Sequence, residues 1–437
     1  MRLFVTATTI AALLTGTAIA QQAASPPAAV APAPAVSFAA TQALYDSYVA
    51  QGKVPGIVGG FGAGDFPTVF VQAGKINEAG TAAGPDSLWR VYSMTKPVTA
   101  MAAMILIDEG KLKLDQPISD FIPEFKTMRV QLNADTIESR PATRPITVRN
   151  LLTHTAGLGY NIITKGPLLD LYNKKGINPA QLNAATEVQF RDLRPANVQD
   201  FAKVVASVPL IADPGTKWSY SIGLDVMVAV VEKAAKMPFD SFVQQRIFDP
   251  LKMKASFWTV PASAAAQLST NYGFAPGDRL VPLDPAASSV YLQKPSFPYG
   301  GAGLVMSARD YDRFLHMLQN YGTLDGVRIM KPATAKLAMS NLLPPGVTFG
   351  GVGGATGGTA GPAMGFGAGG SVVLLDGPGT IAGTYAWGGA AGTKAWVNPV
   401  KKFRGTIMVN YFPSDKWPVQ ADTMKALMVD MARLGVK

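Results

Sequence analysis

The hexapeptide Val91-Tyr92-Ser93-Met94-Thr95-Lys96 places a hydroxyl group and an amine three residues apart. Residues i and i+3 lie on one face of a helix, so the Lys96 ammonium can come within hydrogen-bond reach of Ser93 Oγ. A serine becomes a nucleophile when a neighbouring group takes its proton, and a lysine can take it when burial or a nearby cation depresses its pKa. The spacing therefore predicts an activated serine, although a helix N-cap serine followed by an exposed lysine has the same pattern.

The residues that follow the hexapeptide predict a buried helix. Residues 97–107 are apolar almost all round, and a helix that is apolar on every side lies inside a protein. We expect this helix to run to about Gly110. A serine at its N-terminus lies where backbone N–H groups point towards the position of an oxyanion.

The first residues of the chain predict a secretory signal. Arg2 precedes an apolar run at residues 3–14, and Ala18-Ile19-Ala20 supplies the small residues of a cleavage site. We therefore expect residues 1–20 to be a cleaved signal peptide and the mature protein to be periplasmic or secreted. No later run of about eighteen apolar residues follows, and the absence of cysteine excludes lipoprotein attachment, so we expect no stable membrane anchor.

Composition indicates a folded, enzyme-sized body. The chain has 437 residues, of which 48% are hydrophobic. A formal net charge of +10 could indicate nucleic acid or an anionic membrane. The basic residues are scattered, however, and no basic helix with interleaved aromatic residues occurs, so we expect no nucleic-acid partner.

Composition and periodicity divide the mature chain into a linker and a folded body. Residues 21–37 are Ala/Pro-rich without apolar periodicity, which is typical of a flexible tether. Within residues 38–437, we expect an α/β lobe from residues 38–90 and 299–437 and a mainly helical lobe from residues 91–298. The predicted helices are 38–52, 197–208, 224–237, 239–248 and 311–321, the last with Ser307 as N-cap, and the predicted strands are 56–64, 68–76, 371–376, 381–387, 394–398 and 404–411.

The C-terminal part of the chain predicts a sheet with a helix on it. Its strands alternate or run apolar between Gly and Pro turns, which indicates an antiparallel sheet. The last helix should pack on that sheet through an apolar face made of Val419, Met424, Leu427, Met428, Met431 and Leu434. The glycine-rich residues 350–370 lack Gly-Lys-Ser/Thr, so they predict a mobile loop and not a phosphate site.

Two further motifs are candidates for the same site. Trp218-Ser219-Tyr220-Ser221 follows a predicted turn, and its tyrosine could complete a proton path with the lysine or could be a buried tyrosine with a hydrogen-bonded hydroxyl. Trp387-Gly388-Gly389-Ala390 ends a predicted strand, where glycines let a substrate approach the backbone or form a simple turn. The two histidines, His154 and His316, lie far apart without metal-ligand spacing, so we expect no metal and no cofactor.

Together and in this order, the three motifs resemble the serine β-lactamase and penicillin-binding protein superfamily, and in particular the family VIII carboxylesterases, which share the class C β-lactamase fold. The resemblance extends over essentially everything after Phe38. It includes Ser93-Met94-Thr95-Lys96 and residues 114–125, 151–158, 218–225 and 300–307. It implies an α/β (α+β) fold of the β-lactamase/transpeptidase type, with an antiparallel sheet flanked by helices and a mostly helical lobe.

The resemblance also implies roles for the site residues. Ser93 would be the nucleophile, and Lys96 and Tyr220 would share its proton. The backbone N–H groups of Ser93 and Ala390 would form an oxyanion hole, with Trp387, Gly388 and Gly389 beside the substrate.

Two positions depart from the class C pattern. Trp387 stands where those enzymes have the lysine that supports recognition of the antibiotic carboxylate. Ile222 stands where their tyrosine motif ends in Asn, and it cannot hydrogen-bond an amide side chain. Both changes weaken a β-lactam assignment, and Trp-Gly-Gly is common among the family VIII esterases.

These observations predict an exported serine hydrolase that cleaves small, short-acyl esters through an acyl-serine intermediate. One alternative keeps the mechanism with a β-lactam or a D-amino-acid peptide as substrate. Another is a non-catalytic module that binds cell-wall peptides, which would not need all of Ser93, Lys96 and Tyr220. A Ser-His-Asp triad through His154 is a further possibility, but the resemblance assigns this histidine to a structural loop.

Overall fold

The computed structural model describes residues 37–351, 363–377 and 379–434. The predicted signal peptide, the linker up to residue 36 and residues 352–362 of the glycine-rich stretch lie outside the described residues. The α-helices are α1 (Ala39–Ala50), α2 (Thr95–Asp108), α3 (Val148–Leu152), α4 (Gly166–Lys174), α5 (Ala184–Phe190), α6 (Val198–Ala206), α7 (Gly223–Ala235), α8 (Phe239–Val243), α9 (Ala308–Gln319), α10 (Pro332–Ala338) and α11 (Val419–Arg433).

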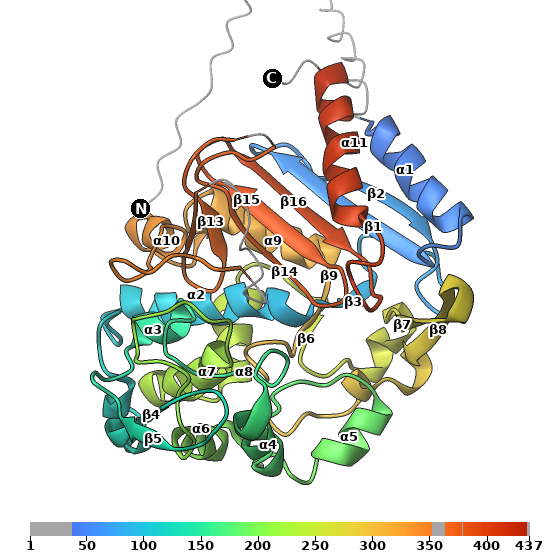
Figure 1. The fold of residues 1–437 in the computed structure, drawn as a ribbon. Helices are drawn as coiled ribbons and strands as arrows, with labels where there is room; N and C mark the ends of the chain where they lie inside the picture. The colour runs from blue at the N-terminus through green and yellow to red at the C-terminus, as the bar shows by residue number, and fades with distance from the viewer. Residues whose placement is uncertain (1–36, 352–362, 378, 435–437) are drawn as a thin grey trace, which may run out of the picture. The chain divides into compact units, whose positions relative to one another are not determined.

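A seven-stranded antiparallel sheet joins the two ends of the folded region. Its strands lie in the order β12 (Met364–Phe366), β13 (Ser371–Val373), β14 (Tyr385–Gly388), β15 (Lys394–Asn398), β16 (Phe403–Met408), β1 (Gly56–Ala63) and β2 (Val69–Gly74). Every neighbouring pair is antiparallel. In Figure 1 the blue N-terminal strands therefore lie beside the red C-terminal strands.

Smaller sheets connect the remaining segments. They are β3-β9-β6, made of β3 (Leu88–Arg90), β9 (Val305–Ser307) and β6 (Ser256–Phe257), and the hairpins β4 (Arg129–Gln131) with β5 (Ser139–Pro141), β7 (Asn271–Ala275) with β8 (Arg279–Asp284), and β10 (Thr323–Leu324) with β11 (Val327–Arg328). The β3 strand leads directly into the hexapeptide that holds Ser93.

Alternating side chains give the large sheet two buried faces. Ile57, Trp396 and Ile407 pack with α1 and α11 on one face. Their chain neighbours, Val58, Val397 and Met408, point to the other face and join the main core with α2 and α9. Figure 1 shows α1 and α11 side by side on the first face.

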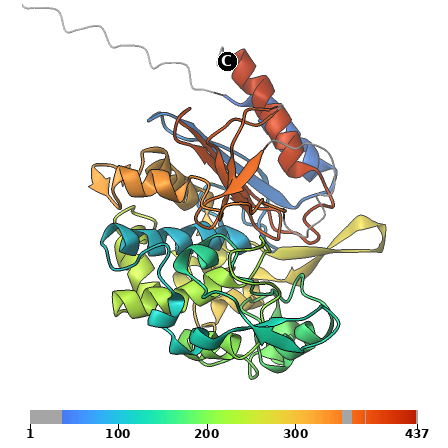
Figure 2. The same cartoon turned by 60° about the vertical axis from the view of Figure 1, so that its left-hand side comes forward.

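Helix α2 lies between the sheet and the other helices. Its residues 95–106 are all buried, because α7, α8 and α10 contact it in addition to the core beneath the sheet. In Figure 1 and Figure 2 the teal to green helices α3 to α8 gather on the side of α2 away from the seven-stranded sheet. The prediction of a helix that is buried all round is confirmed.

The predicted antiparallel sheet flanked by helices is also confirmed, and most elements form within a few residues of their expected bounds. Ser307 is the N-cap of α9, where its Oγ accepts a hydrogen bond from Asp310 N at 3.1 Å. The strand expected at 381–387 begins only at Tyr385, because Gly383 has φ of +80° and Thr384 bonds back to Ile381 O in a turn. The helix expected at 239–248 changes from α8 to a π-helix at Gln244–Phe248.

Two sequence expectations are wrong. Met364–Phe366, assigned to a loop, form the edge strand β12 because they pair with β13. Met428 and Leu434 are 55% and 42% exposed, so they do not belong to the buried face of α11. Met428 is turned by one residue from the stripe that faces α1 and the sheet, and Leu434 follows the last helical turn.

The strands of the seven-stranded sheet fall in the segments assigned to the α/β lobe, and the helices α3 to α8 fall in the segment assigned to the helical lobe. The lobe boundaries themselves stay a prediction. None of the helices in the described ranges is both long enough and apolar enough to cross a membrane.

Candidate active site

The structure brings Ser93, Lys96 and Tyr220 together. Ser93 lies in a short 3₁₀ turn, Tyr92–Met94, that leads into α2. Lys96 Nζ is 3.2 Å from Ser93 Oγ, and Tyr220 OH donates a hydrogen bond to the same oxygen at 2.6 Å. The lysine is on the first turn of α2, whereas the tyrosine comes from the loop before α7. The serine hydroxyl is thus hydrogen-bonded to the two groups predicted to share its proton, whose catalytic roles stay predictions.

These groups are held in a nearly dry environment. Lys96 is fully buried, and Ser93 and Tyr220 are 9% and 3% exposed. Besides Ser93, Lys96 Nζ donates to Gly301 O at 2.8 Å and lies 5.2 Å and 4.6 Å from the ring centroids of Tyr160 and Tyr220. Aromatic faces attract an ammonium ion. No Asp or Glu of the described ranges forms a direct ion pair with Lys96.

Sequence reasoning missed Asp225, which lies behind the lysine in the first turn of α7. Its side chain is fully buried, and Oδ1 accepts a hydrogen bond from Gly301 N at 2.8 Å. Burial raises the pKa of Asp225 to about 7, against the opposing influence of the Lys96 charge. An acidic residue between Leu224 and Val226, at the start of the apolar stretch 224–231, is the sequence signal that could have identified it.

His154 does not form a catalytic triad in this arrangement. Its Nδ1 lies 2.9 Å from Ser221 Oγ and accepts from Ser221 N at 3.2 Å, and no hydrogen bond among the described residues joins it to Ser93 or to a carboxylate. Burial lowers the pKa of His154 well below its usual range, and the Lys96 charge adds to the effect. The ring packs 4.9 Å from the Tyr220 ring centroid, so this neutral imidazole supports the tyrosine.

His316, the other histidine, lies on α9 with Nε2 3.2 Å from Asp65 Oδ1. It belongs to no part of the site. Ile222 is fully buried at the N-terminus of α7, where its N–H donates to Gly159 O at 3.2 Å. Its side chain therefore fills core space at the place where the class C pattern has an amide.

Aromatic rings form one wall of the site. Tyr220 packs against Trp387, with centroids 5.7 Å apart, and Phe366 lies edge-on to Trp387 at 5.2 Å. Trp218 and Phe349 continue the wall, with centroids 4.8 Å apart. Trp387 is 8% exposed, and its Nε1–H has no hydrogen-bond acceptor among the described residues. The predicted aromatic surface is thus present next to Tyr220.

The end of β14 is pressed against the hexapeptide. A Cβ on Gly389 would lie 2.3 Å from Val91 O and 2.2 Å from Thr393 Oγ1, so only glycine allows this approach. Gly389 N donates to Thr393 O at 2.8 Å, which fixes the turn after the strand. Ala390 follows at the surface, and within the described residues its N–H donates no hydrogen bond. The contact with Val91 brings this free donor close to the residues before Ser93.

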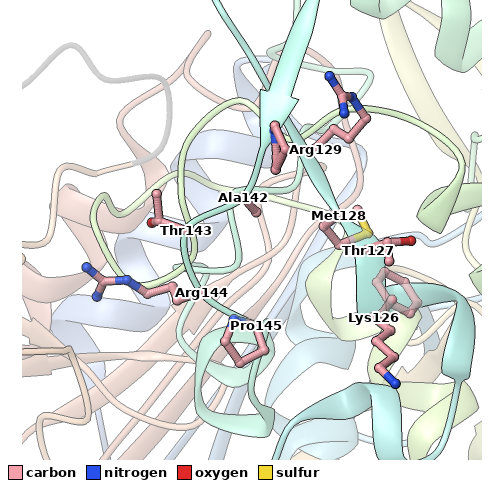
Figure 3. A pocket seen from close by; sticks show the side chains of 10 residues that line it. Lys126, Thr127, Met128, Arg129, Ala142, Thr143, Arg144 and Pro145 are labelled. Atoms are coloured by element: carbon pink, nitrogen blue, oxygen red, sulfur yellow. The ribbon is translucent and has the colours of Figure 1, made fainter.

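A separate groove of about 660 Å³ lies between the segments around β4 and β5 (Figure 3). It is lined by Phe125, Lys126, Thr127, Met128, Arg129, Pro141, Ala142, Thr143, Arg144 and Pro145. None of the predicted site residues contributes to it.

Known proteins similar to this chain include an esterase and an acyltransferase. The sequence matches the beta-lactamase family over residues 41–427. It is 30% identical to the esterase EstB of Burkholderia gladioli over 340 residues, 74% of this chain and 76% of that protein. It is 28% identical to the acyltransferase calJ of Penicillium decumbens over 347 residues, 75% and 77% of the two chains.

The fold is also similar to that of solved proteins. The structure of EstCE1, a hydrolase with promiscuous acyltransferase activity, aligns with a TM-score of 0.72 and 23% identity over 89% of this chain and 98% of that chain. At this identity the alignment supports the fold alone.

Proposed function

Because the chain belongs to the beta-lactamase family and is a serine hydrolase, we propose that it cleaves small esters with short acyl chains through an acyl-serine intermediate on Ser93. The observation that carries this proposal is the contact of Ser93 Oγ with both Lys96 and Tyr220 in a site from which water is largely excluded. A hydroxyl with two such partners can lose its proton as it attacks a carbonyl carbon.

The proposed reaction has two halves. Ser93 Oγ attacks the ester carbonyl while its proton passes to the Lys96 and Tyr220 pair. The N–H groups of Ser93 and Ala390 stabilise the oxyanion, and the proton then goes to the leaving alcohol as the carbon–oxygen bond breaks. Water next attacks the acyl-serine, gives a proton to the same pair and releases the acid, and Ser93 regains its hydroxyl.

Neutral esters fit the site better than β-lactams. The aromatic wall around Trp387 offers apolar area, and the indole of Trp387 itself carries no charge that could pair with a substrate carboxylate. The similar protein EstB is an esterase. Both points support the ester over the β-lactam or D-amino-acid peptide as substrate.

A panel of p-nitrophenyl esters beside a chromogenic cephalosporin, assayed with the purified protein, tests the proposal. We expect rapid turnover of short-acyl esters and slow or absent cephalosporin opening. Faster opening of the cephalosporin would favour the β-lactamase alternative. No turnover of either, with no covalent labelling of Ser93 by a serine-directed phosphonate, would favour the binding module.

Acyl transfer to an alcohol is a second candidate. The apolar wall beside Ser93 could hold an alcohol in preference to water, and calJ is an acyltransferase. Adding a primary alcohol to the ester assay should then convert part of the acyl product from acid to new ester. Unchanged acid yield would exclude this candidate.

We also propose that the protein is exported, on the basis of the signal pattern in residues 1–20. The test is expression of the full chain and of a chain without these residues, followed by cell fractionation and intact-mass analysis. The full chain should be cleaved and exported, and the shortened chain should stay in the cytoplasm. Retention of the uncleaved full chain in the cytoplasm would contradict this.

Replacing Gly389 with alanine should lower kcat by roughly 10²- to 10³-fold, the usual effect of losing one oxyanion donor. The added Cβ would collide with Val91 O and Thr393 Oγ1 and push Ala390 away from Ser93. Gly273→Ala in β7 is the matched control, because a Cβ there meets nothing within 4 Å. Steady-state kinetics on folded proteins would show the difference. Equal activities of the two variants would show that the Ala390 N–H is not an oxyanion donor.

Replacing Trp387 with lysine should shift the ratio of cephalosporin to ester turnover towards the anionic cephalosporin. A hydrogen bond to a charged group contributes roughly 1.5–3 kcal/mol, or roughly 10- to 100-fold, and Ile222 limits the gain because it supplies no amide contact. Absolute ester activity should fall, since the indole packs on Tyr220 and Phe366. Trp387→Met controls for lost packing without charge. An unchanged kcat/KM ratio in a folded Trp387→Lys protein would show that this position does not set substrate class.

A further inference from the structure

We propose that Asp225 is a positioning residue of the active site, the buried carboxylate that anchors Gly301 and balances the charge of Lys96, so that the amine stays in contact with Ser93 Oγ. This inference rests on the proposed function, and it goes further by naming a residue that acts on Ser93 only through Lys96.

Lys96 Nζ is surrounded by a carbonyl oxygen and two aromatic rings. Its Nζ donates to the carbonyl oxygen of Gly301 at 2.8 Å and faces the rings of Tyr160 and Tyr220. Carbonyl dipoles and aromatic faces both stabilise a cation. A fully buried ammonium still needs a negative charge, because burying an unpaired charge is costly. Among the described residues no acid contacts Lys96 directly, and Asp225 is the carboxyl group that interacts with it electrostatically.

Gly301 connects the two side chains. Its carbonyl oxygen accepts the Lys96 hydrogen bond at 2.8 Å, and its N–H donates to Asp225 Oδ1 at 2.8 Å. A Cβ at this position would lie 2.5 Å from Asp225 Oδ2, so the absence of a side chain allows the carboxylate to approach the backbone that holds the lysine. Gly301 thus links the carboxylate of Asp225 on α7 to the amine of Lys96 on α2.

The second carboxylate oxygen argues against a purely structural role. Asp225 Oδ2 is buried and has no hydrogen-bond partner among the described residues. Leaving a buried polar atom without a hydrogen-bond partner is unfavourable. An asparagine or a serine could accept the Gly301 hydrogen bond without burying a charge. The negative charge itself therefore needs an explanation, and compensation of Lys96 supplies one.

Few other charges act on Asp225. Besides Lys96, Tyr160 in the loop after α3 interacts electrostatically with Asp225. Arg149 of α3 pairs with Asp115 at 2.7 Å. The charged residues that α6 and α8 contribute next to α7 are exposed, namely Asp200, Lys203 and Asp240. Lys96 is thus the principal cation for Asp225.

The test compares Asp225→Asn with wild-type protein in the ester assay. Asparagine keeps the shape and the hydrogen bond from Gly301 N but removes the charge. We expect kcat to fall about 10- to 100-fold, by analogy with residues that orient the ligands of a metal ion, with KM little changed. Wild-type kcat in a folded Asp225→Asn protein would overturn the proposal.

Asp310→Asn is the matched control. Asp310 is also buried, accepts a backbone hydrogen bond from Ala255 N at 2.6 Å, and has a pKa that burial raises to about 6. It lies at the start of α9, outside the site. Its replacement should affect thermal stability and leave kcat unchanged. Equal loss of kcat in both variants would mean that the effect of Asp225→Asn is structural, and the proposal would fail.

The pH dependence of the wild-type protein gives a measurement that needs no variant. Because burial raises the pKa of Asp225 to about 7, lowering the pH through 7 protonates the carboxylate and removes the counter-charge. Both kcat/KM and the rate of Ser93 labelling by a phosphonate should therefore fall below about pH 7. Asp225→Asn should lack this acidic limb. A labelling rate that is flat between about pH 5 and pH 9 in the wild-type protein would overturn the proposal.

The two proposals fail in distinguishable ways. Absence of ester turnover in the wild-type protein would overturn the proposed function, while the labelling rates would still compare wild type with Asp225→Asn. Normal ester turnover with an identical pH profile in both proteins would overturn the role of Asp225 alone.

Discussion

Replacing Ser93 with alanine should reduce ester hydrolysis to the assay background, a loss on the order of 10⁶-fold, as found for removal of a serine nucleophile in another hydrolase. The substitution deletes the attacking oxygen and its hydrogen bonds to Lys96 and Tyr220. The fold should persist, because a smaller side chain fits a 3₁₀ turn whose neighbours Tyr92 and Met94 are anchored in the core.

Intact-mass analysis after treatment with a serine-directed phosphonate checks the assignment independently of any substrate. The wild-type protein should gain one adduct and Ser93→Ala none, with similar thermal unfolding of both proteins. Peptide mapping should place the adduct on Ser93. An adduct on any other residue would refute the nucleophile.

Lys96→Ala and Tyr220→Phe should each lower kcat by roughly 10²- to 10⁴-fold, the typical contribution of general acid–base groups. Their combined loss should be far from the product of the two, because both act on one proton path. Tyr220→Phe is the cleaner variant. It removes only the hydroxyl that lies 2.6 Å from Ser93 Oγ and keeps the ring packed between His154 and Trp387.

His154→Ala is the control for these two variants. The histidine is buried, its Nδ1 bonds to Ser221, and its ring supports Tyr220. We expect lower thermal stability and a modest effect on kcat from a small shift of Tyr220. Steady-state kinetics and melting curves for the three variants separate the roles. If folded His154→Ala lost as much activity as Lys96→Ala, a histidine base would have to be reconsidered.

Several features could be predicted because they depend on neighbours along the chain. The Ser93 and Lys96 contact follows from their spacing on one helix turn, and the buried α2 from an apolar run without a polar face. The Ser307 N-cap was recognisable from its position before Asp310. The start of β14 was not predicted correctly. The strand begins at Tyr385 and not at residue 381, because the positive φ at Gly383 interrupts the extended chain.

The sequence alone determined a serine and a lysine three residues apart at the start of one buried helix, an antiparallel sheet and, through resemblance, the family and the candidate tyrosine. Only the tertiary structure decided that Tyr220, 127 residues from Ser93, donates to the same oxygen, and that Gly301, 205 residues from Lys96, joins it to Asp225. The physical reason is the distance along the chain between the residues in contact. Spacing and periodicity describe contacts within a helix turn or a strand. The charge balance of a buried lysine depends instead on residues distant in the sequence, which the packing of α2 against α7 brings close to it.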